Sequence, residues 1–214
     1  MDDVELKDFL KRYEGSEAGV YKDSKGIPTV GVGSNLNSPE VPKLLESLGT
    51  SRQEILSGKQ LSPEQSDTLL DKQLEEKKRY YNNIQKRDFP NSDIQEHERR
   101  ALDSLMFQNP SLVGPKLRGY LENNDDIGAA KEILLNSNKN NSGGVAKRRL
   151  GEAKMFSGDR FSELVESLSD QEVQQIYSMV NSIKNPYTRQ QVLDEYPFLK
   201  QIVKPTRFKN IIGK

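Results

Sequence analysis

Two carboxylates near the start of the chain, Glu14 and Asp23, lie in contexts that favour opposite protonation states. Glu14 ends a predicted amphipathic helix, and Gly15 directly after it is a typical stop signal. A carboxylate in the last turn of a helix faces the negative end of the backbone dipole. Partial burial acts in the same direction, so both effects favour the protonated form. Glu14 is therefore a candidate general acid.

A short helix and a hairpin must position these groups. The helix is predicted from an apolar stripe with i, i+3, i+4 and i+7 spacing, made by Leu6, Phe9, Leu10 and Tyr13. Asp23 lies in a Lys-Asp-Ser-Lys-Gly turn between two alternating segments, where Gly26 is free to take a positive φ. We expect a tight hairpin there, with Asp23 solvated and ionised.

A protonated and an ionised carboxylate together suit the hydrolysis of a glycosidic bond. One protonates the leaving oxygen, while the other activates water or stabilises the oxocarbenium-like transition state. Thr29, shortly after the hairpin turn, can hold that water. On residue types alone the pattern is weak, because most Glu and Asp side chains are solvated surface groups.

Three segments together resemble a known family. Glu14, Asp23 and Thr29 have the spacing of the catalytic triad in phage-type lysozymes, or endolysins, of glycoside hydrolase family 24. Residues 99–109 resemble that family's core helix, which ends in an aromatic and an amide beside the substrate cleft, and residues 144–156 are similar to its late arginine-rich helix. The similarities follow the family's order over roughly residues 4 to 158.

The resemblance implies a muramidase, an enzyme that cleaves the β-1,4 bond between N-acetylmuramic acid and N-acetylglucosamine in peptidoglycan. Glu14 would be the general acid, Asp23 the residue that assists water, and Thr29 a positioning group. Members of the best-studied type invert the anomeric centre. Peptidoglycan strands are the expected partner of a monomeric enzyme, and no cofactor or metal is implied.

Further site residues follow from the same resemblance. Substrate contacts are expected from Leu36, Phe107, Gln108 and Asn109. Amides at helix ends also form local caps, so Gln108 and Asn109 are either substrate contacts or helix caps.

An arginine from the late helix is expected to hold Glu14 in place, and either Arg148 or Arg149 can do so by the resemblance. The alternative is a purely structural pairing of either arginine with Glu152, at i+4 or i+3.

The chain departs from the family at two places. Ser34 stands where the family usually has a histidine, which removes an ion-pair partner and makes the stability of the small lobe uncertain. Residues 137–143 contain no aromatic side chain, where some relatives place one near the cleft.

Composition excludes several other classes of protein. The 214 residues include no cysteine, so no disulfide framework is present, and 32 basic against 32 acidic residues leave no net charge to attract nucleic acid. No stretch approaches about 18 apolar residues, so neither membrane insertion nor a signal peptide is expected. His97 lies in a polar run, which predicts a surface position without a metal cluster.

The fold class predicted from the resemblance and the patterns is α+β, mainly α, with two lysozyme-like lobes. We expect a small α+β lobe with the triad (residues 1–60), a linking helix (61–83), a helical lobe (84–158) and a helical extension (159–214). Helices are expected at 41–48, 51–56, 63 to about 80, 94–107, a short stretch after Pro115, 126–135, and a segment ending near Phe156.

The extension goes beyond the resemblance. Apolar periodicity predicts helices over 161–168 and 173–183, the second opened by a capping box at Ser169 and Glu172. Asn185 and Pro186 are expected to break it, and a third helix is expected over 188–196. The end of the chain is basic, with Lys204, Arg207, Lys209 and Lys214. The extension is either packing structure or a site for wall polymer, a virion component or a regulatory partner.

Two competing functions remain at this stage. A lytic transglycosylase needs the acid but uses the substrate's own hydroxyl, and a virion or wall-binding protein can keep a lysozyme fold without turnover. The intact Asp23 and Thr29 argue against the transglycosylase, and the presence of both Glu14 and Asp23 gives no support to the non-catalytic protein. The sequence leaves three biological roles open. The protein is an endolysin held in the host cytoplasm until release to the wall, a virion-associated enzyme or a bacterial effector.

Overall fold

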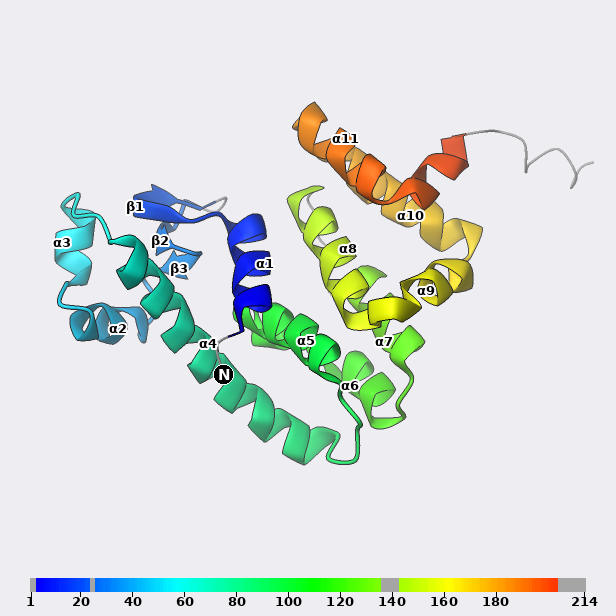
Figure 1. Ribbon diagram of the computed structural model, residues 1–214, viewed down its shortest axis with the longest axis horizontal. Coiled ribbons are helices and arrows are strands. Elements are labelled where there is room, and N and C mark those ends of the chain that lie inside the picture. The colour runs from blue at the N-terminus through cyan, green and yellow to red at the C-terminus, as the bar shows by residue number, and fades with distance from the viewer. Residues whose placement is uncertain (1–2, 24–25, 136–142, 204–214) are drawn as a thin grey trace, which may run out of the picture. The chain divides into compact units, whose positions relative to one another are not determined.

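The computed structural model describes residues 3–23, 26–135 and 143–203. The chain divides into two compact units, residues 1–84 (unit 1) and 85–214 (unit 2). The described residues form mainly helices, together with a three-stranded antiparallel sheet in unit 1 (Figure 1). This confirms the predicted α+β class with a predominance of helix.

Helix α1, Val4–Glu14, begins at an N-cap, Asp3, and ends at the predicted glycine stop. The Asp3 carboxylate accepts a hydrogen bond from the Leu6 N–H, which satisfies a donor that the first turn leaves open. Leu6 and Leu10 are fully buried, as expected for the apolar stripe. Gly15 has φ +78°, a conformation that disfavours other residues and ends the helix directly after Glu14.

The sheet follows directly, in the order β1 (Glu17–Lys22), β2 (Pro28–Gly31) and β3 (Ser34–Asn35). Strands β1 and β2 form the predicted hairpin, with Tyr21 opposite Thr29, and Gly26 takes φ +78° in the connection. Strand β3 pairs with β2 through a second turn in which Gly31 and Gly33 have positive φ. The hairpin prediction is confirmed.

Two short helices, α2 (Val41–Ser47) and α3 (Arg52–Leu56), complete the small lobe. They enclose an apolar cluster with side chains from the sheet and from the next helix: Val30, Leu36, Val41, Leu45, Ile55, Leu61 and Leu69.

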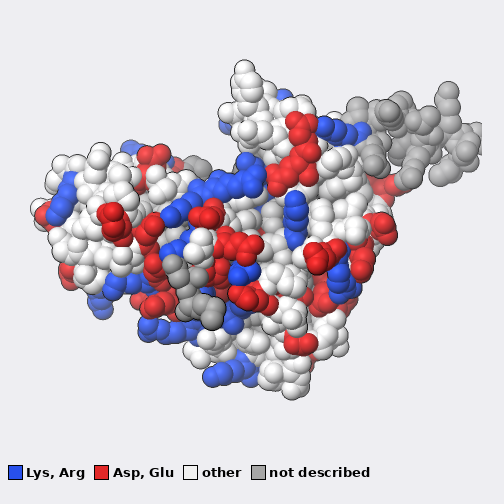
Figure 2. Space-filling model, viewed as in Figure 1, with Lys and Arg blue, Asp and Glu red and all other residues white. Residues whose placement is uncertain are grey.

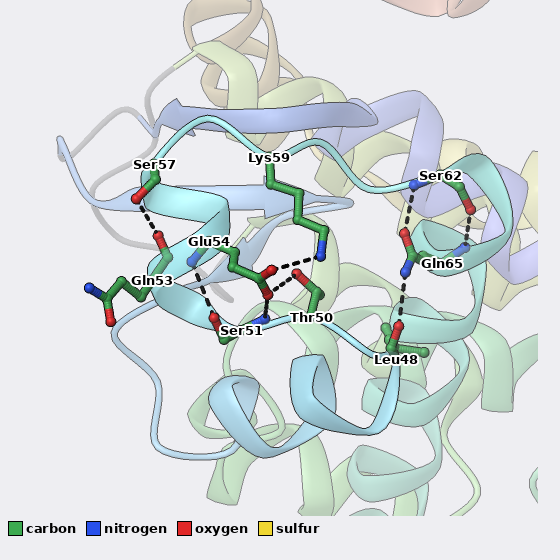
Figure 3. Close-up of polar contacts among 9 residues, drawn as sticks. All are labelled: Leu48, Thr50, Ser51, Gln53, Glu54, Ser57, Lys59, Ser62 and Gln65. Carbon is green, nitrogen blue, oxygen red and sulfur yellow. Dashed lines mark hydrogen bonds and ion pairs between the residues drawn. The ribbon is translucent and has the colours of Figure 1, made fainter.

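Helix α3 is short and depends on side-chain hydrogen bonds at its start (Figure 3). One carboxylate, Glu54, accepts from the Ser51 N–H (2.9 Å), the Thr50 hydroxyl (3.2 Å) and the Lys59 ammonium (3.0 Å). The Ser51 hydroxyl accepts from the Glu54 N–H in return, which makes a capping box. Glu54 thereby ties the start of the helix to the loop that follows it.

Helix α4 runs over Pro63–Asp88. A capping box opens it, because the Ser62 hydroxyl accepts from the Gln65 N–H and the Gln65 side-chain oxygen accepts from the Ser62 N–H (Figure 3). The predicted end near Tyr80 is wrong. Tyr81 and Ile84 are buried, so tertiary packing continues the helix through a polar stretch of weaker propensity.

Unit 2 is helical throughout the part that the structure describes. Its elements up to the extension are α5 (Glu96–Gln108), η1 (Pro110–Leu112), α6 (Pro115–Glu122), α7 (Asp126–Leu135) and α8 (Gly143–Ser157). Helix α5 begins two residues later than predicted, because Gln95 is extended and its N–H donates to the Glu98 carboxylate (2.8 Å) as a cap. Helices α5 and α7 both pack against α8.

The extension continues with η2 (Gly158–Arg160), α9 (Phe161–Ser167), α10 (Asp170–Asn181), α11 (Pro186–Glu195) and η3 (Pro197–Val203). The capping box at Ser169 and Glu172 is confirmed. Asn185 and Pro186 do not break α10, which has already ended. The Asn185 carbonyl oxygen caps α11 by accepting from the N–H groups of Tyr187 and Thr188.

The extension packs on the helices that precede it. Helix α9 contacts α7 and α8, and α10 contacts the same pair. Buried apolar side chains on the extension side are Leu164, Ile176, Val180, Val192 and Leu199. The extension is packed at these residues, whereas the basic residues at positions 204–214 lie outside the described part of the chain.

Acidic and basic side chains are interspersed on the face shown in Figure 2. This agrees with the balanced composition and gives no single-sign field on that face. Among the residues that the structure describes, no helix combines the length and apolar character needed to cross a membrane.

Candidate active site

Glu14, the predicted general acid, lies half-buried at the C-terminal end of α1. Its side chain lies against Gly33 in the turn between β2 and β3. A Cβ atom at Gly33 would stand 3.5 Å from Glu14 Oε2 and 3.6 Å from Glu14 Cγ. Those distances are ordinary van der Waals contacts, whereas the φ of +72° at Gly33 is a conformation that favours glycine.

Asp23 and Thr29 are connected through one residue, Ile27. Asp23 Oδ1 accepts a hydrogen bond from the Ile27 N–H (2.8 Å), and the Thr29 hydroxyl donates to the Ile27 carbonyl oxygen (3.0 Å). The Asp23 N–H also donates to that carbonyl (3.0 Å). The hairpin therefore orients a half-buried carboxylate and a buried hydroxyl from the same backbone residue.

Tyr21 is a further side chain at this site to which the sequence motif assigned no role. Burial raises the pKa of its phenol, the Gly33 backbone lowers it in part, and the nearby carboxylates Glu17 and Asp23 raise it further. The hairpin register opposite Thr29 is the signal that could have indicated it.

Ser34 stands where the family usually has a histidine, and it forms a neutral hydrogen bond there. Its hydroxyl donates to Gln73 Oε1 in α4 over 2.7 Å, and both side chains are buried. A hydroxyl–amide pair thus connects the sheet to α4 without a charge.

In unit 2, the predicted arginines belong to a buried polar cluster. Arg148 Nε donates to Glu152 Oε1 (2.9 Å), and Arg149 forms an ion pair with Glu152 Oε2. Ser104 in α5 donates to Glu152 Oε1 (2.7 Å) and accepts from Arg148 through its backbone carbonyl (2.9 Å). The structural pairing with Glu152 is confirmed for both arginines. Burial lowers the pKa of Arg149.

The predicted substrate contacts differ in their surroundings. Gln108 is exposed and its carbonyl oxygen accepts from Arg149, whereas the Asn109 carbonyl oxygen caps η1 by accepting from the Ser111 N–H (3.0 Å). Phe107 is half-buried. Leu36 is only 1% exposed and packs in the core of unit 1, so its side chain has no free surface for a sugar.

His97 is half-buried rather than fully on the surface. It lies close to Gly158, where a Cβ atom would stand 3.0 Å from the imidazole ring. With residues such as Glu98, Asp126 and Arg160 it lines a cavity of about 240 Å³ in unit 2.

Comparison with known protein families shows the family to which this chain belongs. The sequence matches the phage lysozyme family over residues 11–152, which include Glu14, Asp23, Thr29 and the two arginines Arg148 and Arg149. The chain belongs to the phage lysozyme family. It is therefore a peptidoglycan hydrolase of the glycoside hydrolase class. The family match ends before the extension begins.

Solved structures agree with the fold of a phage lysozyme. An endolysin from Escherichia coli O157:H7 phage FAHEc1 aligns with a TM-score of 0.57 and 21% identity, covering 74% of this chain and 95% of that one. A mutant of P22 lysozyme gives 0.53 and 25%, with coverages of 72% and 96%. The muramidase domain of SpmX from Asticaccaulis excentricus gives 0.51 and 16%, with 72% and 95%. Comparison with curated protein sequences gives no match.

Proposed function

We propose that this phage lysozyme is a muramidase in which Glu14 is the general acid and Asp23 directs the attacking water. The bond cleaved is the β-1,4 linkage between N-acetylmuramic acid and N-acetylglucosamine. The observation that carries the proposal is the Asp23–Ile27–Thr29 arrangement, because it holds a carboxylate and a hydroxyl on one backbone residue close along the chain to Glu14.

The first proton movement is assigned to Glu14. Its position at the C-terminal end of α1 and its partial burial disfavour the ionised form, so a proton is available for the leaving oxygen. As the glycosidic bond breaks, that proton moves to the oxygen of the leaving sugar and Glu14 becomes a carboxylate.

The second proton movement is assigned to Asp23. A water that donates to Asp23 and to Thr29 Oγ1 is held by both groups, since the Thr29 hydroxyl proton is already used at Ile27 and leaves the oxygen as an acceptor. Asp23 takes a proton from this water as its oxygen attacks the anomeric carbon. Attack from the side opposite the leaving group inverts that carbon.

The remaining site assignments are part of the same proposal. Gln108, Asn109 and Phe107 contact the glycan, and Arg148 or Arg149 orients Glu14. The bonds of the two arginines with Glu152 support a fixed placement of their guanidinium groups in unit 2. The enzyme acts on the wall as a monomer. It reaches the wall either as an endolysin released from the host cytoplasm or as a virion-associated enzyme.

Lysis of chloroform-permeabilised Gram-negative cells tests the activity, with mass spectrometry of the released fragments testing the chemistry. Wild-type protein is expected to lower turbidity and to release fragments with reducing muramic ends. Glu14→Gln keeps the size of the side chain and removes the acid, so lysis should fall by at least about 10²-fold. The matched control Glu46→Gln removes an exposed carboxylate of unit 1 and should lyse like wild type.

Three outcomes would contradict the proposal in different ways. Full lysis by Glu14→Gln would remove the acid assignment. Fragments with 1,6-anhydro ends would make the enzyme a lytic transglycosylase. Binding of wild-type protein to cell walls without lysis would place it among non-catalytic wall-binding proteins.

A further inference from the structure

Gln108 is the last residue of α5, and its side chain is held by a buried arginine of α8. Arg149 Nη2 donates a hydrogen bond to Gln108 Oε1 over 2.5 Å. Gln108 is exposed, whereas Arg149 is fully buried. The bond therefore joins an amide at the surface of unit 2 to a charged group in its interior, where α5 and α8 pack together.

Arg149 is held in place by the rest of the buried polar cluster. Its Nη1 forms an ion pair with Glu152 Oε2, about one turn further along α8. Glu152 Oε1 in turn accepts from the Ser104 hydroxyl of α5 over 2.7 Å and from Arg148 Nε over 2.9 Å. All of these side chains are buried. Packing and hydrogen bonds therefore fix the guanidinium group that contacts Gln108.

The arginine determines which way the Gln108 amide faces. A guanidinium group has only N–H donors, so the amide can bond to it only through its carbonyl oxygen. The Gln108 Nε2 group, with two N–H donors, is therefore directed away from Arg149. Among the residues that the structure describes, none accepts a hydrogen bond from it. A bond accepted by the carbonyl oxygen also polarises the amide, which makes those two N–H groups stronger donors.

We propose that Arg149 is a positioning residue that presents the Gln108 amide as a fixed donor for the acetamido carbonyl oxygen of a bound N-acetyl sugar. The proposal rests on Gln108 contacting the glycan, which is part of the proposed function. A sugar hydroxyl both donates and accepts, so it can pair with either end of a glutamine amide, whereas the acetamido oxygen only accepts. An amide that offers donors alone therefore favours the acetamido oxygen. Because Arg149 orders the side chain beforehand, binding costs less conformational entropy.

Gln108→Glu is the direct test, because it keeps the size of the side chain and an acceptor for Arg149 but removes both N–H donors. Binding of soluble peptidoglycan glycan strands is measured by calorimetry in the full chain with Glu14→Gln as background, so that the strands are not cleaved. The affinity is expected to fall about tenfold. Gln108→Met removes the polar group without adding a charge and should lose as much. Gln174→Glu, at an exposed position in α10, is the control for the added charge and should bind like the background chain.

Strands from which the acetyl groups have been removed test the acceptor on the sugar. The background chain is expected to bind N-acetylated strands more tightly than de-N-acetylated ones. In Gln108→Met this preference should shrink about tenfold, because the donor that reads the acetamido oxygen is gone. No preference in the background chain would overturn the proposal, and so would an unchanged preference in Gln108→Met.

Arg149→Lys tests the positioning step, with the side-chain amide of Gln108 followed by nitrogen-15 NMR relaxation without ligand. Lysine keeps the charge but loses the planar fork that bonds to Glu152 and Gln108 together. In wild type the Gln108 amide should be more ordered than that of exposed Gln174, and in Arg149→Lys the two should be equally mobile. If Arg149→Lys does not fold, the wild-type spectrum decides, because an amide of Gln108 as mobile as that of Gln174 would overturn the positioning role.

These measurements separate the proposal from the catalytic assignments, because none of them needs turnover. Wild-type protein that does not lyse cells but shows the expected binding preference and an ordered Gln108 amide would contradict the roles of Glu14 and Asp23 and support that of Arg149. Normal lysis with unchanged affinity in both Gln108 variants would overturn the role of Arg149 and leave the muramidase standing.

Discussion

Ser34 and Gln73 are joined by a buried hydrogen bond in which Ser34 Oγ donates to Gln73 Oε1 over 2.7 Å. The bond links β3 to α4 within unit 1, at the position where the phage lysozyme family usually has a histidine. A neutral pair of this kind does not gain or lose a proton near neutral pH, so it holds the turn beside Glu14 equally well across that range.

Ser34→Ala is expected to lower the free energy of unfolding by about 1–3 kcal/mol, because it leaves the buried Gln73 oxygen without its donor. Chemical denaturation measures this loss. Combining Ser34→Ala with Gln73→Leu should recover part of it, since the second change removes the unsatisfied group. Ser47→Ala, at an exposed hydroxyl, is the control. Equal stability of Ser34→Ala and the control would show that the bond contributes nothing.

Glu152→Ala is expected to destabilise unit 2 by about 3–5 kcal/mol, because two buried guanidinium groups lose their shared carboxylate. Hydrogen exchange of the amides in α5 and α8 measures the effect where it acts. Glu166→Ala removes an exposed carboxylate in α9 and serves as the control. Unchanged protection of both helices would contradict a structural role for the cluster.

Ile176→Ala tests whether the extension stabilises the helices on which it packs. Ile176 is fully buried in α10, which contacts α7 and α8, so a loss of about 2–5 kcal/mol is expected. Hydrogen exchange should show weaker protection in α8 as well as in α10. Gln174→Ala on the exposed side of α10 should have little effect. Loss of protection confined to α10 would mean that the extension folds without supporting α8.

Glu98→Gln is expected to raise the unfolding temperature near pH 7 and to have no effect well below the ordinary glutamate pKa. Burial raises the pKa of Glu98 in the folded protein, so the folded state binds the proton more tightly than the unfolded chain. The stability from that proton is complete below the unfolded pKa of about 4.3 and is lost as pH rises through the higher folded pKa.

Thermal unfolding at several pH values measures this difference. The side-chain amide introduced by Glu98→Gln would still accept from the Gln95 N–H, so the cap is preserved and the gain near pH 7 should be about 1–3 °C. Glu166→Gln should unfold like wild type at every pH. A gain that is the same at acid and neutral pH would show that ionisation of Glu98 is not its cause.

Local patterns in the sequence determined most elements of the fold. Helix starts are set by hydrogen bonds within a few residues, at the serine caps Ser51, Ser62 and Ser169. The end of α1 is set by the backbone angles of the glycine that follows Glu14. Apolar periodicity indicated the buried face of α1 for the same reason. Such features lie within a short window of sequence and can be predicted without knowing the rest of the chain.

Tertiary packing determined the length of α4 and the contacts between residues that are distant in the sequence. The length of α4 depends on burial of Tyr81 and Ile84, which no local propensity indicated. The Ser34–Gln73 bond joins residues far apart in the sequence, and the β2–β3 turn brings Gly33 close to Glu14. The triad's residue types were recognisable in advance, but the residues that hold them in place were not. A side chain's partner depends on which backbone segments the whole core brings together.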